Sequence, residues 1–232
     1  DARQKVTGEA VYVFDLKFPG MLAGKMLRSP HAHARIVKID TSKAEKLPGV
    51  RAVVTADDTP KIKFGSNEYF FPYTVDQYPL EFEKVRYIGD EVAAVAAVDE
   101  ATAERALSLI EVEYEVLPAV FDPLEAMKPG APQIHAARNN IGVMLPVCFG
   151  DPDRALKESD YVHEDVFVLP SAAHAALEPH VSIGQYEVST NRITLWSSTQ
   201  APFKIREAMA KTLRMQEADI RVIKLNVGGG FG

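Results

Sequence analysis

Short apolar runs separated by turn residues dominate the first half of the chain. Residues 9–16, 20–29, 34–40 and 49–56 are rich in Val, Ala, Ile and aromatic residues, and Pro, Gly, Ser or Asp separates them. This pattern predicts β-strands with brief connections. Residues 84–99 predict two more strands with a bend at Gly89-Asp90, and strict alternation of Val112, Tyr114 and Val116 predicts another.

Helical periodicity is confined to a few short segments. Ala103, Ala106, Leu107 and Ile110 follow the i, i+3, i+4, i+7 spacing of one helix face, and Asp99 is placed to cap that helix. A shorter helix is expected over 41–48, between a Thr-Ser cap and Pro-Gly. Strands mixed with helices in this order predict an α+β fold for residues 1–120.

The pattern changes after this first domain. Residues 118–150 hold five prolines and no sustained period, so we expect a connecting segment at 121–139 and a second domain over 140–232. In the second domain, Asp151-Pro152 predicts a helix start, and the segments 161–169, 180–188 and 192–198 predict strands. A helix over 202–215 and a closing strand over 219–227 complete the prediction.

Composition narrows the classes of function. The chain has 232 residues, a formal net charge of −6 and interspersed charges, which disfavours a nucleic-acid or anionic-membrane surface. The single Cys148 excludes an internal disulfide framework and any cage of several thiolates, and favours a cytoplasmic protein. No run reaches the ~18 apolar residues of a membrane helix. Because the chain opens on Asp and closes on a glycine turn, we expect it to be part of a longer protein.

The first candidate site is the run "KLNVGGGFG" over 224–232. Glycines allow a ligand to approach peptide N–H groups, so a strand that ends in Gly-Gly-Gly is able to cradle an anionic group. The run lacks the spacing of a P-loop and of the dinucleotide fingerprint. From composition alone, a ligand loop and a structural turn both remain open.

The second candidate is "STQAPF" over 198–203, at the predicted junction of a strand and a helix. Gln200 there lies beside free helix N–H groups, where its amide and the backbone can converge on an anion or an oxo ligand. Spacing alone favours the simpler interpretation that Ser198, Thr199 or Gln200 caps the helix.

Two histidine pairs invite a metal interpretation. In "HAALEPH", a strand would hold His174 and His180 about 20 Å apart, too far to share an ion, so Glu178 is expected to be a buried, hydrogen-bonded carboxylate. His31 and His33 lie two residues apart with no third ligand in sight, and we expect them to be structural.

Several of these segments together resemble one family. The combination "KVTGEAVYVFDL", "LRSPHAHARIVKIDTSKAEKLPGVRAVVTADD", "VRYIGDEVAAVAAVDEATAERAL", "VEYEVLPAV", "STQAPF" and "IRVIKLNVGGGFG" resembles the molybdenum-binding subunit of the xanthine oxidase and aldehyde oxidase family. Details are most similar to the α subunit of 4-hydroxybenzoyl-CoA reductase. The resemblance implies an α/β-hammerhead domain followed by the first part of a molybdopterin-binding domain, and hence the N-terminal portion of a catalytic subunit.

The resemblance also implies roles for named residues. Gln200 matches the family's glutamine beside the molybdenum, and Gly229, Gly230, Phe231 and Gly232 match the loop that approaches the metal and the pterin. Glu178 falls in a stretch that supports the pocket. The carboxylate base of the family lies far downstream, so no catalytic residue and no direct metal ligand are expected in this chain, which should be inactive alone.

Cofactors and partners follow from the same resemblance. It implies a molybdenum-pyranopterin, in the molybdopterin cytosine dinucleotide form, with [2Fe-2S] clusters and FAD on partner subunits of a dimer of heterotrimers. The substrate would be an aromatic heterocycle, an aldehyde or an aromatic acyl-CoA. The alternative is a non-catalytic assembly chain that docks electron-transfer subunits in a split molybdenum hydroxylase.

Overall fold

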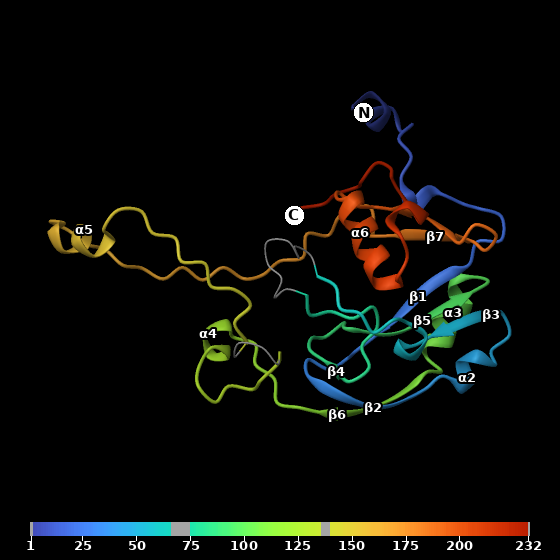
Figure 1. Ribbon diagram of the computed structural model, residues 1–232, viewed down its shortest axis with the longest axis horizontal. Helices are drawn as coiled ribbons and strands as arrows, with labels where there is room; N and C mark the ends of the chain where they lie inside the picture. Colours follow the sequence, from blue (N-terminus) through green and yellow to red (C-terminus); the bar gives the residue numbers. More distant parts are fainter. Residues whose placement is uncertain (1, 66–74, 136–139, 232) are drawn as a thin grey trace.

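The computed structural model describes residues 2–65, 75–135 and 140–231, and its strands form three small sheets (Figure 1). The sequence of residues 65–83, with aromatic residues but no clear period, predicts an ordered loop, and its part at 66–74 lies outside the described residues. The first sheet has the order β1-β5-β3, the second β4-β2-β6 and the third β7-β8-β9. This mixture of helices with mostly antiparallel strands confirms the α+β prediction.

The first sheet and its helices hold the larger core. Its elements are β1 (Ala23–Arg28), β5 (Glu91–Ala97) and β3 (Val50–Val54), with α2 (Ser42–Glu45) and α3 (Glu100–Leu107). Asp99 caps α3 as predicted, because its carboxylate accepts a 2.7 Å hydrogen bond from the backbone N–H of Thr102. Ala103 and Ala106 are fully buried against β5, so small residues let the helix approach the sheet closely.

The second sheet forms a smaller core. Its strands are β4 (Lys84–Val85), β2 (Ala34–Asp40) and β6 (Glu111–Val116). Ala34, Ile36, Val85 and Val92 form its buried cluster. His33 is buried at its edge, with Nδ1 2.6 Å from the carbonyl oxygen of Pro118, and the ring of His31 packs edge-on against Tyr114. Both histidines thus have the structural surroundings that the sequence predicted.

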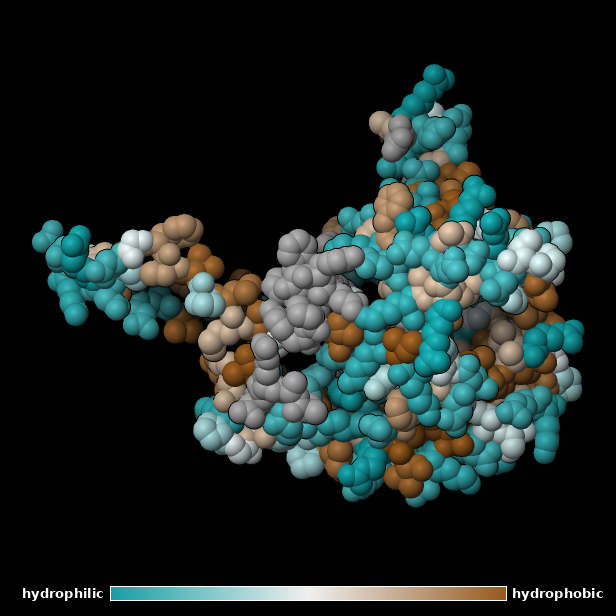
Figure 2. Space-filling model, viewed as in Figure 1, coloured by the Kyte–Doolittle hydropathy of each residue, from teal (hydrophilic) through white to brown (hydrophobic). Residues whose placement is uncertain are grey.

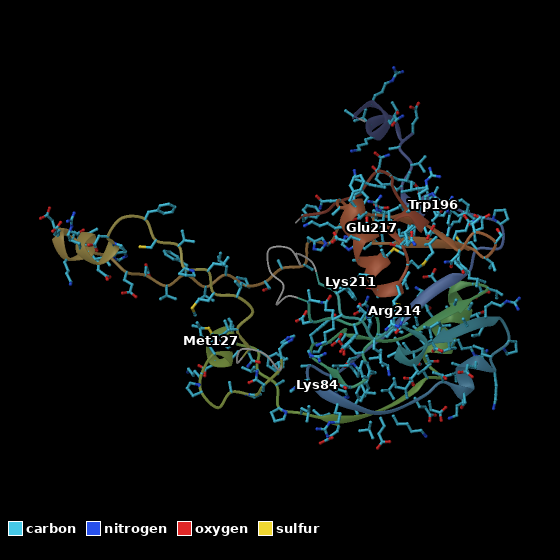
Figure 3. The ribbon with its side chains drawn as sticks, viewed as in Figure 1. Lys84, Met127, Trp196, Lys211, Arg214 and Glu217 are labelled. Carbon is cyan, nitrogen blue, oxygen red and sulfur yellow. The ribbon has the colours of Figure 1, made fainter. Side chains whose placement is uncertain are left out.

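A buried charged cluster lies in the segments that flank β4. Glu81 and Asp90 are 3% and 5% exposed, and the Arg86 guanidinium lies 3.0 Å from Oε1 of Glu81. Burial raises the pKa of both carboxyl groups, against the attraction of Arg86. Nearby, the Nζ of Lys84, which is labelled in Figure 3, donates to the carbonyl of Ile134 in the connecting segment.

The third sheet contains a parallel pair of strands. Its elements are β7 (Ser182–Glu187), β8 (Arg192–Ser197), α6 (Pro202–Leu213) and β9 (Ile220–Lys224). β7 and β8 are antiparallel, whereas β8 and β9 are parallel and joined through α6. The 3₁₀ turn η5 (Glu217–Asp219) leads into β9.

Two predicted strands are absent. Residues 9–16 form the 3₁₀ turn η1 (Val13–Asp15) and a single bridge from Tyr12 to Asn226, because the Asp15 carboxylate accepts from the Tyr12 N–H at 2.9 Å and closes a turn. Residues 161–169 are extended but unpaired. Further helices in the described part of the chain are α1 (Ala2–Thr7), η2 (Ala56–Asp58), α4 (Pro123–Ala126) and α5 (Pro152–Glu158).

Residues near the N-terminus pack on the third sheet. The side-chain amide of Asn226 donates to the carbonyl of Val11 at 3.1 Å, and the ring of Phe18 lies 4.8 Å from that of Trp196 on β8, labelled in Figure 3. The division into 1–120, 121–139 and 140–232 remains a prediction, and these contacts show that its first segment reaches the third.

Candidate functional site

The candidate site lies where the two parallel strands of the third sheet end. Ser197 of β8 is in register with Lys224 of β9, so the segments that follow them leave the sheet at the same edge. Ligands of α/β units commonly bind beyond the carboxyl ends of parallel strands. This topology brings Gln200 and Gly230 together: a Cβ added to Gly230 would lie 1.8 Å from Nε2 of Gln200.

No side chain caps the start of α6. The capping residue is Ala201, which offers no side-chain acceptor, and Thr199 Oγ1 accepts instead from the Ala201 N–H at 3.0 Å. Ser198 Oγ bonds the backbone of Val181 at the start of β7. The capping interpretation of this segment was therefore wrong, and the exposed Gln200 lies against the glycine loop instead.

The glycine run is a tightly packed turn. A Cβ on Gly228 would lie 2.3 Å from Cβ of Glu178, and one on Gly229 would lie 2.6 Å from the Phe231 ring. Gly229 also has φ +137°, a conformation that favours glycine. Sterics at Gly228 and backbone conformation at Gly229 thus favour glycine. Gly232 lies outside the described residues.

Glu178 holds this turn from the neighbouring segment. Glu178 is only 8% exposed, and its Oε2 accepts a 2.7 Å hydrogen bond from the Gly228 N–H. The prediction of a buried, hydrogen-bonded carboxylate is confirmed. Its second oxygen, Oε1, is buried without a hydrogen-bond partner in the described structure. An acceptor is therefore left free beside the loop.

The predicted separation of about 20 Å between His174 and His180 was wrong. Their ring centroids are 5.6 Å apart, and the His174 ring lies 5.6 Å from that of Phe231. The segment is not a strand, and Ala175 has φ +44°, which folds the chain back. Within residues 2–65, 75–135 and 140–231, no group of three His, Cys, Asp or Glu is placed to hold a metal ion.

A pocket of about 730 Å³ adjoins this edge. Its lining includes Gln200, Gly230, Asn226 and Lys224, together with Lys5 and Glu9 from the N-terminal segment. Sequence reasoning missed the N-terminal contribution, since no local signal links Val11 to Asn226, a pair separated by 215 positions. The parallel β8-α6-β9 order was the signal that would have placed Gln200 and Gly230 together.

Two family models match the chain. Residues 7–118 match the aldehyde oxidase and xanthine dehydrogenase a/b hammerhead domain, and residues 134–232 match the molybdopterin cofactor-binding domain. The chain belongs to the xanthine oxidase and aldehyde oxidase family. It corresponds to an N-terminal portion of the molybdenum-binding subunit, with a hammerhead domain and the start of a molybdopterin-binding domain.

Individual relatives agree with this assignment. The "Xanthine dehydrogenase molybdenum-binding subunit" of Escherichia coli is 36% identical over 100% of this chain, which covers 31% of that protein. The "Nicotinate dehydrogenase large molybdopterin subunit" of Eubacterium barkeri is 36% identical over 100% of this chain, which covers 53% of it. The aldehyde oxidoreductase structure from Desulfovibrio gigas has a TM-score of 0.89 at 28% identity over 100% of this chain, which covers 26% of that chain.

Proposed function

We propose that this chain is part of the catalytic subunit of a molybdenum hydroxylase or dehydrogenase. The observation that carries the proposal is the meeting of the Gln200 amide with Gly230 at the carboxyl edge of two parallel strands. A side-chain donor and bare peptide backbone at one edge suit a cofactor with oxygen and sulfur ligands.

The residues present fit a molybdenum-pyranopterin. Gln200 would donate its amide N–H to an oxygen ligand, and the backbone at Gly229 and Gly230 would approach the group closely, because no Cβ intervenes. Phe231 would cover it, and Glu178 would fix the loop through Gly228. Gly232 is proposed for the same loop on the resemblance alone. When bound, the cofactor supplies the redox chemistry, and these side chains position it.

The finer features of the function rest on the family resemblance. We propose the cytosine dinucleotide form of the cofactor, [2Fe-2S] and FAD partner subunits, a dimer of heterotrimers and a cytoplasmic location. The proposed substrates are aromatic heterocycles, aldehydes or aromatic acyl-CoA thioesters. The last class rests on the resemblance to 4-hydroxybenzoyl-CoA reductase. In the described part of the chain, no helix has the length and apolar character to cross a bilayer.

No residue of this chain is proposed as the catalytic base, so the chain alone should not turn over substrate. The test uses the native assembly, isolated through a tag on this chain from cells that make the cofactor. Metal analysis should find molybdenum, and turnover with a purine, an aldehyde or an aromatic acyl-CoA should be detected with a dye acceptor. Gln200→Ala should abolish turnover in a folded protein, and unchanged turnover would refute the role of Gln200.

The shorter Eubacterium barkeri relative favours a second candidate. This chain covers 53% of that relative but 31% of the Escherichia coli one, so molybdopterin subunits of different length occur in the family. The alternative is that this chain is a non-catalytic assembly chain that docks electron-transfer subunits in a split enzyme. One reading frame that continues for several hundred residues favours the catalytic subunit, and a stop codon followed by a second gene favours the split form.

A further inference from the structure

An exposed arm, residues 142–175, projects from the third sheet (Figure 1). All of these residues are exposed, and α5, which lies within the arm, contains no buried residue. Apolar side chains interrupt the hydrophilic surface of the arm (Figure 2). Four of them are consecutive: Val166, Phe167, Val168 and Leu169 are 80%, 83%, 86% and 89% exposed.

These four residues have the pattern of a strand that is covered on both faces. Neighbouring residues of a strand point to opposite faces, so an unbroken run of apolar residues requires apolar contacts on each side. Val and Phe are also frequent in strands. The sequence therefore specifies a strand here, although its side chains contact nothing that would stabilise one.

The backbone of the same segment also lacks backbone partners, although the N–H of Val166 donates to the carboxylate of the adjacent Asp165 at 2.8 Å. Across the described residues, the N–H and carbonyl groups of 160–177 make no hydrogen bond to another backbone group. An extended segment with unpaired backbone groups is a template for pairing with another strand. Both the side chains and the backbone thus indicate a missing sheet.

We propose that residues 161–169 join, as an inner strand, a sheet formed by the remainder of a molybdenum-binding subunit. This inference rests on the proposed function and names the surface by which the chain joins the rest of the catalytic unit. The pairing mode is strand addition, in which main-chain hydrogen bonds bind and alternate side chains fill pockets.

The lengths of the relatives support this occupant. The match to the molybdopterin-binding domain begins at residue 134 and so includes the arm. The similarity to the Desulfovibrio gigas chain covers all of this chain, arm included, although this chain covers only 26% of that one. The arm therefore belongs to a domain whose relatives contain much additional polypeptide.

A second copy of this chain is a poorer occupant. Antiparallel pairing of two copies over 161–169 would place Asp165 opposite Asp165, and like charges directly opposite each other destabilise a strand pair. A ribbon of two strands would also leave both faces of Val166–Leu169 in water. A larger sheet with cover on both sides meets both requirements.

Amide hydrogen exchange on the native assembly tests the proposal. We expect the amides of residues 166–169 to exchange at least about a hundredfold more slowly in the assembly than in the isolated 232-residue chain, as for hydrogen-bonded core strands. If the amides of 166–169 exchange as fast in the assembly as in the isolated chain, the proposal is overturned. Protection that appears together with dimers of the isolated chain would also overturn it, in favour of a second copy.

Two matched substitutions separate the strand from general surface effects. Val168 and Val188 are 86% and 80% exposed, but Val188 lies in the β7–β8 hairpin turn. Both Val168→Asp and Val188→Asp should leave the melting temperature of the isolated chain unchanged. Only Val168→Asp should speed exchange of the remaining 166–169 amides in the native assembly, by at least about tenfold. Equal protection of these amides in both variants would contradict the proposal.

Metal analysis of the same sample distinguishes this inference from the proposed function. Protected 166–169 amides without molybdenum would refute the proposed function and leave the strand addition in place. Molybdenum with unprotected amides would refute the strand addition and leave the function in place.

Discussion

The carboxylate of Glu178 accepts a hydrogen bond from the backbone N–H of Gly228 at 2.7 Å, across fifty positions of sequence. This contact ties the segment before β7 to the loop after β9. It holds the glycine turn against a buried side chain, so the loop is positioned before any ligand arrives. A positioned backbone is what a cofactor site needs, because ordering a loop on binding costs free energy.

Glu178→Ala should release this turn. The Gly228 N–H would lose its acceptor, at a cost of about 1–3 kcal/mol. We expect amide exchange at Gly228 to accelerate about tenfold or more, and molybdenum content of the native assembly to fall. Glu178→Gln should preserve the bond and slow exchange, because its amide oxygen can accept.

The matched control is Glu187→Ala. The Glu187 carboxylate bonds only Ser189 and Thr190 within its own hairpin among the described residues. The substitution Glu187→Ala should therefore leave amide exchange at Gly228 unchanged. Wild-type exchange at Gly228 in Glu178→Ala would show that the contact does not hold the loop.

Gly230→Ala tests the contact with Gln200. The new methyl group would overlap the amide of Gln200, an exposed and flexible side chain that can move away at little cost in stability, and this move would displace the amide from the site. We expect molybdenum content and turnover of the native assembly to fall together. Gly184→Ala on β7 is the control, since nothing lies within 4 Å of its added Cβ.

The double variant Gly230→Ala with Gln200→Ala identifies the cause. It removes the overlapping amide, so its molybdenum content should equal that of Gln200→Ala alone, because the amide is lost from the site in both. A molybdenum content clearly below that of Gln200→Ala would mean that the methyl group acts independently of Gln200.

Local signals in the sequence predicted the elements that local interactions determine. Asp99 and the alanine face of α3 were predicted correctly, because a cap and a period of 3.6 act within one helix. The strands β1, β2, β3, β5 and β6 were also predicted, since each carries its own pattern and pairs within the first 120 residues.

Features that depend on distant partners were not predicted. The Tyr12 bridge to Asn226 and the Gly228 bond to Glu178 have no local signature. The strand expected at 161–169 is unpaired in the described structure, because a strand needs a partner that its own pattern cannot supply. Of the site residues, the structure brings Gln200, Gly230, Phe231 and Glu178 together, and their roles toward a cofactor stay a prediction.

The buried Asp90 predicts a pH dependence of stability. Burial raises its pKa above the ordinary value of 3.8, against hydrogen bonding from the Arg86 N–H. The folded state therefore holds this proton more tightly than the unfolded state, so its contribution is full below about pH 4 and is lost as pH rises through the raised pKa. Asp90→Asn keeps an acceptor for Arg86 and removes the charge.

Urea unfolding at two pH values checks this sign. Asp90→Asn should be more stable than the wild type at pH 7, and the difference should disappear near pH 3. Asp160→Asn, on the exposed arm, should match the wild type at both values. A loss of stability in Asp90→Asn at pH 7 would mean that the ionised carboxylate stabilises the fold through Arg86.

Two helix caps with the same chemistry should differ in their effect on the fold. Asp99 caps α3 and Asp151 caps α5, and each accepts from a backbone N–H three residues later. α3 carries buried alanines of the main core, whereas α5 has no buried residue. Asp99→Ala should lower the melting temperature of the chain by about 2–4 °C, while Asp151→Ala should not change it, because fraying of α5 exposes no core. Calorimetry of the two variants decides the matter. Equal losses would mean that the arm folds cooperatively with the core, and its unpaired strand would then need another explanation.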